Sequence, residues 1–198
     1  NTTLTTTSGI PNIYELTFDG STANAYANGT NVGTQTGISP GTTLTTSQQL
    51  TCVNGGANTF IEYEILFYNT NLSTSQRQQV EGYLSRKWGI QVSSNYVFSN
   101  LPTPILPISS IVSVWMDASN ALSVFNAPPV SYIMDISGNG NTLNVTNGPS
   151  YPPTISYQQN GMNGLYMTGN TAYTTPALTL ASSSNVAIFM VANIISLA

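Results

Sequence analysis

The sequence predicts an all-β sandwich that carries a single amphipathic helix. Short alternating or apolar runs are separated by Gly, Asn and Pro, which is typical of antiparallel strands joined by tight turns. Six Asn-Gly steps supply the positive-φ geometry of such turns. Only one segment combines helical periodicity with start and stop signals, at residues 73–88.

Five segments are expected to be strands, at residues 13–18, 60–68, 111–116, 164–168 and 186–195. In the first, "IYELTF", Tyr14, Leu16 and Phe18 share one face. Strict alternation through "FIEYEILFY" places Glu62 and Glu64 together on one face. We therefore expect both carboxylates to lie on the less buried side of that strand.

The helix is expected to begin after Ser73, because Gln76 three residues later completes a capping box, and to end at Gly89. Its buried stripe is formed by residues spaced four apart: Val80, Leu84 and Trp88. All positive charges of the chain are on this helix, namely Arg77, Arg86 and Lys87. Since they lie off the stripe, we expect a solvated charged face, with Arg86 and Lys87 favoured by the helix dipole.

Composition excludes several classes of function. The 198 residues are 40% hydrophobic and only 5% charged, with a net charge of −4, so the chain is expected to fold rather than to be disordered. Binding of nucleic acid requires several clustered Lys or Arg that neutralise the phosphates of the backbone. Three cations on one helix do not form such a surface, so we expect no nucleic-acid partner. The longest apolar run, residues 186–195, is far shorter than the ~20 residues of a membrane span.

Nucleophiles and general bases are scarce. Cys52 is the single cysteine, so no internal disulfide can form, and we expect the protein to be made in a reducing compartment. The absence of His removes the commonest general base and metal ligand. We therefore expect no catalytic residues and no enzyme activity.

The loop "DISGNGN" is a weak candidate for a calcium site. Its oxygen-bearing side chains alternate, as they often do in calcium loops: Asp135, Ser137, Asn139 and Asn141. Only one carboxylate is present and no bidentate Glu follows at the usual distance. We therefore favour a turn in which Asp135 bonds its own backbone, and we expect no cofactor, with calcium as the minor alternative.

Four Asn-x-Ser/Thr tripeptides could accept glycans, at Asn1, Asn28, Asn71 and Asn144. In a chain this rich in Asn and Thr such tripeptides arise easily. Glycosylation therefore stays open from the sequence alone.

The proline-rich stretch at residues 93–110 divides the chain almost in half, because Pro removes ladder donors and stiffens the backbone. Residues 1–92 precede this expected linker and residues 111–198 follow it.

Both halves resemble parts of a known module. The second half contains a Trp-x-Asp-Ala motif at residues 115–118 and the "DISGNGN" loop, and the first half contains "AYANGT" at residues 25–30 and "EILFYNTNLSTSQRQQVEGYLSRKWGI" at residues 64–90. These motifs resemble the concanavalin A-like (laminin G-like) jelly-roll modules found repeatedly in giant-virus proteins. The resemblance implies an antiparallel two-sheet jelly roll.

The order of the halves is inverted relative to that family, in which the Trp-x-Asp-Ala part comes first. Three explanations fit this order. The chain could be a segment of a longer protein with tandem modules, its halves could dock as one permuted unit, or each half could be completed by a neighbouring subunit. The resemblance implies a non-enzymatic structural protein at the virion surface, such as a fibre, filament or capsid decoration, that associates with its own copies or other virion proteins. The alternative is an adhesion module that binds host glycans.

Some related folds are glycoside hydrolases, which use two carboxylates across a cleft. Glu62 and Glu64 are two apart on one strand, but the Glu-x-Asp-x-x-Glu pattern of those enzymes is absent. We therefore expect this pair to form an exposed strand face rather than a catalytic dyad.

Overall fold

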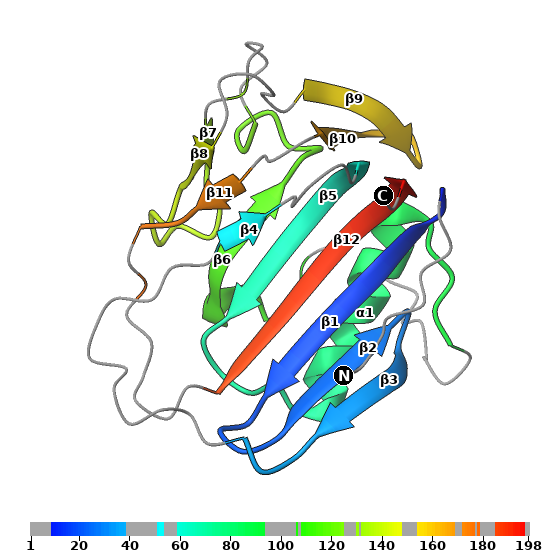
Figure 1. Cartoon of the computed structure of the whole chain (residues 1–198), viewed down its shortest axis with the longest axis vertical. Helices are drawn as coiled ribbons and strands as arrows, with labels where there is room; N and C mark the ends of the chain where they lie inside the picture. The colour runs from blue at the N-terminus through cyan, green and yellow to red at the C-terminus, as the bar shows by residue number, and fades with distance from the viewer. Residues whose placement is uncertain are drawn as a thin grey trace.

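In the part of the chain that the structure describes, two antiparallel β-sheets pack with one α-helix (Figure 1). The computed structural model describes residues 9–38, 51–53, 59–93, 106, 108–124, 130, 132–147, 154–168, 172–176, 178 and 185–196. The all-β class with one helix is confirmed, in a sandwich-like arrangement.

The large sheet has eight strands in the order β3-β2-β1-β12-β5-β10-β9, and β6 also pairs with β5. Their bounds are β1 Pro11–Phe18, β2 Ala23–Ala27, β3 Thr30–Gln35, β5 Thr59–Tyr68, β6 Val112–Asp117, β9 Thr154–Gln159, β10 Met162–Thr168 and β12 Val186–Ser196. All five strand segments expected from the sequence are confirmed as members of this sheet, with small shifts at their ends.

The small sheet has four short strands in the order β4-β11-β8-β7. Their bounds are β4 Thr51–Val53, β7 Tyr132–Ile133, β8 Leu143–Asn147 and β11 Ala172–Thr174. A 3-10 turn, η1 Ser109–Ile111, leads into β6.

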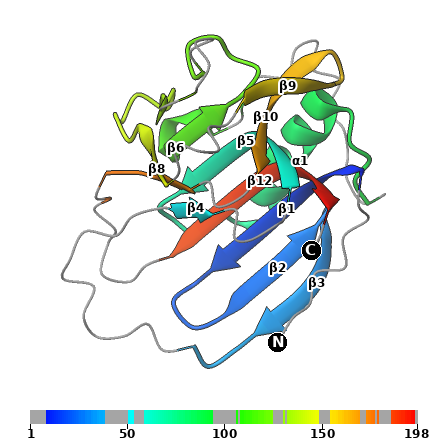
Figure 2. The ribbon, with the colours of Figure 1, turned by 45° about the horizontal axis from the view of Figure 1, so that its top comes forward.

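Two hydrophobic cores lie on opposite faces of the large sheet. The first fills the space between the sheet and helix α1 (Thr74–Trp88), and its largest fully buried side chains include Trp88, Tyr63 and Tyr68. The second joins the other face to the small sheet through residues such as Tyr173 and Ile133. Figures 1 and 2 show the helix behind the large sheet, under β1 and β12.

Strands from the two halves of the sequence alternate within the large sheet. β12, near the end of the chain, lies between β1 and β5 from the first half. The other edge of β5 pairs with β10 at residues 59–62 and with β6 at residues 64–68. Of the expected linker, residues 94–105 and 107 lie outside the described residues, whereas Leu106 is buried in the helix-side core.

Helix α1 has the ends that the sequence predicts. Ser73 caps the first turn, and the reciprocal bond from the Ser73 backbone to the Gln76 side chain completes the capping box. Gly89 ends the helix in the left-handed conformation. The last carbonyls accept hydrogen bonds from the β9–β10 turn, where Gln159 Nε2 donates to Trp88 O and Asn160 Nδ2 to Lys87 O.

Two of the Asn-Gly steps form the expected turns with positive φ at both residues, at Asn28 and at Asn160. The step at Asn163 is different, because both of its residues belong to β10 and the strand is bulged between them. The turn expected there is therefore wrong. The step at Asn54 lies outside the described residues.

Strand β5 contains a β-bulge that the alternating pattern does not reveal. Opposite β12, Glu64 pairs with Val191 and Glu62 with the next residue, Ala192, so Tyr63 is the extra residue. Ile61 and Tyr63 belong to the helix-side core, whereas Ile65 belongs to the core under the small sheet. The bulge therefore turns Glu64 towards the helix and leaves Glu62 on the opposite face, so the shared face expected for the two carboxylates is wrong.

Gly164 of β10 allows this strand to approach the bulge. A Cβ at this position would lie 2.5 Å from Ile61 Cγ2 and 2.6 Å from Tyr63 Cε1. We expect Gly164→Ala to reduce the free energy of unfolding by about 1–3 kcal/mol, because a packed core cannot move aside without strain. Chemical denaturation measures the change.

Gly82 provides the matched control. It lies within α1, and a Cβ there would meet nothing within 4 Å. Gly82→Ala should therefore raise the free energy of unfolding by about 0.5–1 kcal/mol, because Ala is the better helix former. The packing argument would be wrong if both substitutions changed stability in the same direction.

Candidate functional site

Most charged side chains of this protein lie in its interior. All seven acidic and three basic residues of the chain are described, and eight of these ten are buried. Arg86 is half-buried and Asp19 is exposed. The exposed strand face expected for Glu62 and Glu64, and the solvated face expected for Arg77 and Lys87, are both wrong.

The Glu64 carboxylate is the centre of the first cluster. Four donors surround it: Tyr83 Oη and Trp115 Nε1 donate to Oε1 over 2.8 Å each, and Trp88 Nε1 donates to Oε2 over 2.7 Å. The fourth is Lys87 Nζ, 2.9 Å from Oε2. Burial raises the pKa of the Glu64 carboxyl, and the Lys87 ammonium opposes that effect.

Lys87 uses all three of its ammonium protons inside the protein. Nζ donates to Asp117 Oδ2 over 2.6 Å and to Tyr83 Oη over 3.2 Å, in addition to its ion pair with Glu64. It also lies 5.0 Å from the centroid of the Trp88 ring. The side chain of Lys87 is 9% exposed, so water screens these interactions very little.

Asp117 is held at the end of β6 in a fixed orientation. Its Oδ1 accepts hydrogen bonds from Ser119 N over 3.0 Å and from Ser119 Oγ over 2.6 Å, while Oδ2 faces Lys87. Its own backbone N–H donates to Ser123 Oγ. Each oxygen of this carboxylate therefore has different partners.

The second cluster forms around Arg77, in the first turns of the helix. Nη1 lies 2.7 Å from Glu81 Oε1 and 3.2 Å from Glu15 Oε2 on β1. The guanidinium stacks over the Tyr26 ring at 4.1 Å from its centroid. Burial, together with the nearby Glu81 carboxylate, raises the pKa of Glu15 to about 9, although Arg77 lowers it.

Glu62 is buried, and among the described residues it has no ion pair and neither of its carboxylate oxygens has a hydrogen-bond partner. Its side chain faces the core under the small sheet, opposite Leu165 of β10. Burial alone raises the pKa of the Glu62 carboxyl to about 8. The group is therefore mostly protonated at neutral pH.

The "DISGNGN" loop folds around Asp135. Its Oδ1 accepts hydrogen bonds from the backbone of Trp115 and Ser137, and its Oδ2 from the backbone of Asn141 and the Ser137 hydroxyl. Asn139 Nδ2 donates to Val112 O. This is the turn that the sequence favours, and it ties the loop to β6. Within the described ranges, no three His, Cys, Asp or Glu side chains gather as metal ligands.

The three described glycan-acceptor tripeptides have different surroundings. The Asn28 side chain, in the β2–β3 turn, bonds to the first residues of β1, where its Oδ1 accepts from Ile13 N and its Nδ2 donates to Asn12 Oδ1. Asn71 and Asn144 are both exposed, and Asn144 Nδ2 donates to the neighbouring carbonyl of Thr142. Asn1 lies outside the described residues.

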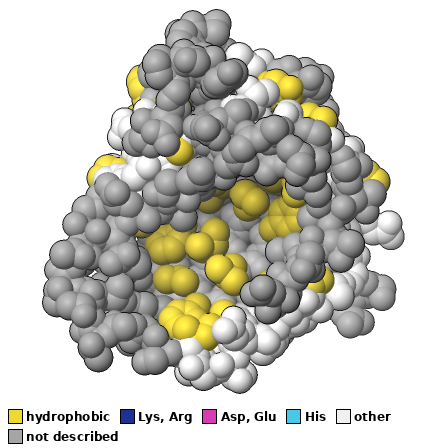
Figure 3. Space-filling view, viewed as in Figure 1, with side chains coloured by type: hydrophobic (Ala, Val, Ile, Leu, Met, Phe, Trp, Pro, Cys, Tyr) yellow, Lys and Arg dark blue, Asp and Glu magenta, His cyan; other side chains and the backbone are white. Residues whose placement is uncertain are grey.

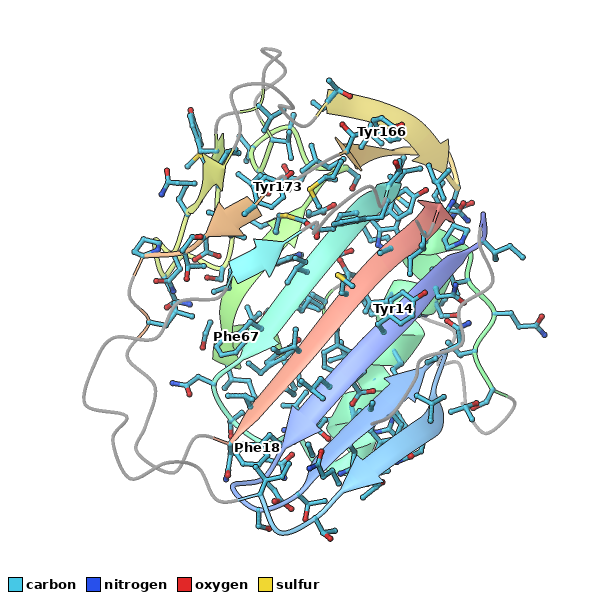
Figure 4. All side chains as sticks on the ribbon, in the orientation of Figure 1. Tyr14, Phe18, Phe67, Tyr166 and Tyr173 are labelled. Atoms are coloured by element: carbon cyan, nitrogen blue, oxygen red, sulfur yellow. The ribbon has the colours of Figure 1, made fainter. Side chains whose placement is uncertain are left out.

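An apolar hollow lies on the face of the large sheet away from the helix. Cross-strand pairs between β1 and β12 contribute Tyr14 with Met190 and Leu16 with Ile188. Leu16 is 44% exposed. Figure 3 shows hydrophobic side chains gathered in this hollow with no charged side chain visible on the whole face, and Figure 4 shows Tyr14 over β1.

Comparison of the chain with protein-family models, curated proteins and solved structures finds no match. Among the described residues, the helix that runs for 15 residues is too short and too polar to cross a membrane.

The buried clusters could have been found from the helix spacing. Arg77, Glu81, Leu84 and Trp88 follow one another at intervals of four, three and four, so Arg77 and Glu81 extend the apolar stripe. Lys87 follows Tyr83 by four and lies on the flank of the stripe. Nothing in the sequence indicates the bulge that brings Glu64 to the same place.

Proposed function

We propose that this protein is a non-enzymatic structural component of the surface of a giant-virus particle, such as a fibre, filament or capsid decoration. The observation that carries the proposal is the inverted distribution of charge: eight of the ten charged side chains are buried, and six of these eight form the ion-pair clusters between helix and sheet. These ion pairs stabilise the packing of the helix on the sheet. The exposed surface consists mainly of neutral polar and apolar groups.

Exposed acids and bases offer little for catalysis. Asp19 is the exposed carboxylate, and its Oδ1 accepts hydrogen bonds from Ser21 N and Thr22 N, which lower the pKa of the group. Acid-base catalysis on a polymeric or small substrate requires a pair of groups that reach the substrate. A solitary, already ionised carboxylate in a turn does not provide that pair.

The resemblance to concanavalin A-like modules gains support from where its motifs lie. Lys87 and Trp88 come from the motif that closes such modules, and Trp115 and Asp117 from the motif that opens them. In the folded chain Lys87, Trp88 and Trp115 surround the Glu64 carboxylate, and Asp117 pairs with Lys87. Motifs that meet in this way act as one structural unit.

Light scattering and negative-stain electron microscopy test the proposal on the purified chain. We expect assemblies with a regular repeat at high protein concentration, since a particle component must associate with its copies or with other particle proteins. A monodisperse monomer over the whole concentration range, combined with hydrolysis of a glycan substrate that is lost in Glu64→Gln, would contradict it.

A second candidate function is binding of carbohydrate, and the half-buried Tyr14 ring on the face of β1 away from the helix favours it, because sugars stack on aromatic rings. A glycan array distinguishes the two functions. If the hollow binds glycans, Tyr14→Ala should abolish the array signal. Tyr132→Ala, which removes an exposed ring from the small sheet, should keep it.

A further inference from the structure

We propose that the side chains of Lys87 and Asp117 join in an intramolecular amide bond, formed by the protein itself with Glu64 as the proton carrier. The bond would connect the last turn of helix α1 to the end of strand β6. It goes beyond the structural role proposed above, which stands whether or not the bond forms.

The amine and the carboxylate that would react are already in contact. Lys87 Nζ lies 2.6 Å from Asp117 Oδ2, in a place where both side chains are at least nine-tenths buried. Because the two groups are held together in one molecule, their reaction is intramolecular. The effective concentration of one group at the other is then far higher than any concentration reached in solution. An amine becomes a nucleophile only when it loses its proton, and Asp117 Oδ2 is the acceptor nearest to that proton.

The two oxygens of Asp117 are prepared for different roles. Ser119 N and Ser119 Oγ donate to Oδ1, and these two donors stabilise the negative charge that develops on this oxygen when the amine attacks the carboxyl carbon. Oδ2 faces the Lys87 ammonium, which can give it a proton. Oδ2 is therefore the leaving oxygen, and Oδ1 remains as the amide carbonyl.

Glu64 lies where a general base is needed. Its Oε2 is 2.9 Å from Lys87 Nζ, and the hydrogen bonds from Trp88, Trp115 and Tyr83 fix the carboxylate in place. Burial, together with the nearby Asp117 charge, raises the pKa of the Glu64 carboxyl, which favours its uptake of a proton from the amine. The geometry thus combines an amine, an acid and a base.

The reaction balances without any other reagent. A proton passes from the Lys87 ammonium to Asp117 Oδ2, and the neutral amine attacks the carboxyl carbon. Glu64 takes the second amine proton and returns it to the departing hydroxyl. The carbon–nitrogen bond forms, the carbon–Oδ2 bond breaks, and one water molecule leaves. One positive and one negative charge disappear from the interior, which removes the desolvation cost of that ion pair.

Mass spectrometry of the intact, denatured protein tests the proposal. After the folded chain has been kept at neutral pH until its mass is constant, we expect a mass lower than that of the sequence by one water molecule. Trypsin should then cut after Arg77 and Arg86 but not after Lys87. Chymotryptic digestion should give a branched peptide that joins the segments around Lys87 and Asp117.

Loss of water at the Asp19-Gly20 step, by cyclisation to a succinimide, would change the intact mass by the same amount. The branched peptide distinguishes the two products, since a succinimide leaves the Lys87 peptide linear. Hydroxylamine opens a succinimide and leaves an amide intact, so the mass deficit should persist after this treatment.

Two variants isolate the role of Glu64. Glu64→Gln keeps a side chain of the same shape but removes the base, and we expect it to show the full sequence mass. Glu62→Gln makes the same change at a buried glutamate on the other face of the same strand, and we expect it to keep the mass deficit. Circular dichroism verifies that both variants are folded.

Asp117→Asn gives a further readout, because an asparagine in this position releases ammonia instead of water. We expect this variant to reach the same final mass as the cross-linked wild-type protein. If folded wild-type protein keeps its full sequence mass and trypsin cuts after Lys87, the three side chains form an ion-pair cluster only and the proposal is wrong.

Discussion

Replacing Arg77 by Met is expected to lower the free energy of unfolding by about 3–5 kcal/mol at neutral pH, which is the usual cost of leaving a buried charge without its partner. Arg77 is the cation between Glu15 and Glu81, and the side chains of both acids are at most 1% exposed. Met fills a similar length but provides no charge and no donor. The stacking of the guanidinium on Tyr26 is lost as well.

The loss should depend on pH. Arg77 lowers the pKa of Glu15, which is about 9, so without Arg77 the buried Glu15 carboxyl resists ionisation further and the loss should be larger at pH 9 than at pH 7. Urea denaturation at both values measures the difference. Arg86→Met is the matched control, because it removes the same charge from the same helix at a half-buried position, and it should cost less than about 1 kcal/mol.

An equal effect of the two arginine substitutions would contradict the importance of the buried cluster. It would mean that net charge, or the dipole of the helix, determines the change. A large loss for Arg77→Met that did not vary with pH would instead indicate that the aliphatic stem of the arginine packs better than Met, independently of Glu15 and Glu81.

The sequence predicts the helix and the main strands of this fold well, but it does not predict how the strands pair. The helix ends are determined by local chemistry, at Ser73, Gln76 and Gly89, and these predictions are confirmed. The five main strands are likewise visible as apolar runs. Pairing between β12 and its neighbours β1 and β5 joins segments from opposite ends of the chain, and no local pattern determines it.

The candidate site was missed for two physical reasons. A charged residue is expected at the surface unless a partner is known, and the partners of Lys87 come from strands far away in the sequence, at Glu64 and Asp117. The second reason is the bulge at Tyr63, which reverses the face on which Glu64 lies. The one-residue shift at this bulge is thus the difference between the predicted exposed acidic face and the observed buried charge cluster.

The positions of the few charged residues explain what these residues do in this protein. In most proteins Lys and Glu are numerous and lie on the surface, so the number of charged residues does not indicate the role of any single one. Here eight of the ten charged residues are buried, and six of those eight belong to the two ion-pair clusters. The ion pairs therefore position helix α1 on the sheet. Such buried pairs favour one arrangement of helix and sheet over others, since a shifted helix would leave charges unpaired.

Glu62→Gln is expected to make the protein more stable in mildly alkaline solution and to leave its stability at pH 5 nearly unchanged. Burial raises the pKa of Glu62 to about 8 in the folded protein, from its ordinary value of 4.5. Between these values the folded state holds a proton that the unfolded state has lost. The free energy of unfolding of the wild-type protein should therefore fall as the pH rises, by up to about 1.4 kcal/mol per pH unit from this group.

The variant should remove this contribution, because glutamine does not titrate. Urea denaturation at pH 5, 6.5 and 8 should give stability curves that coincide at pH 5 and diverge towards pH 8, with the variant the more stable protein. Glu15, whose pKa is raised to about 9, contributes a slope of the same sign, so Glu62→Gln should flatten the curve without levelling it. Parallel curves would mean that the Glu62 carboxyl reaches water or a cation in solution, contrary to its unpaired burial between the two sheets.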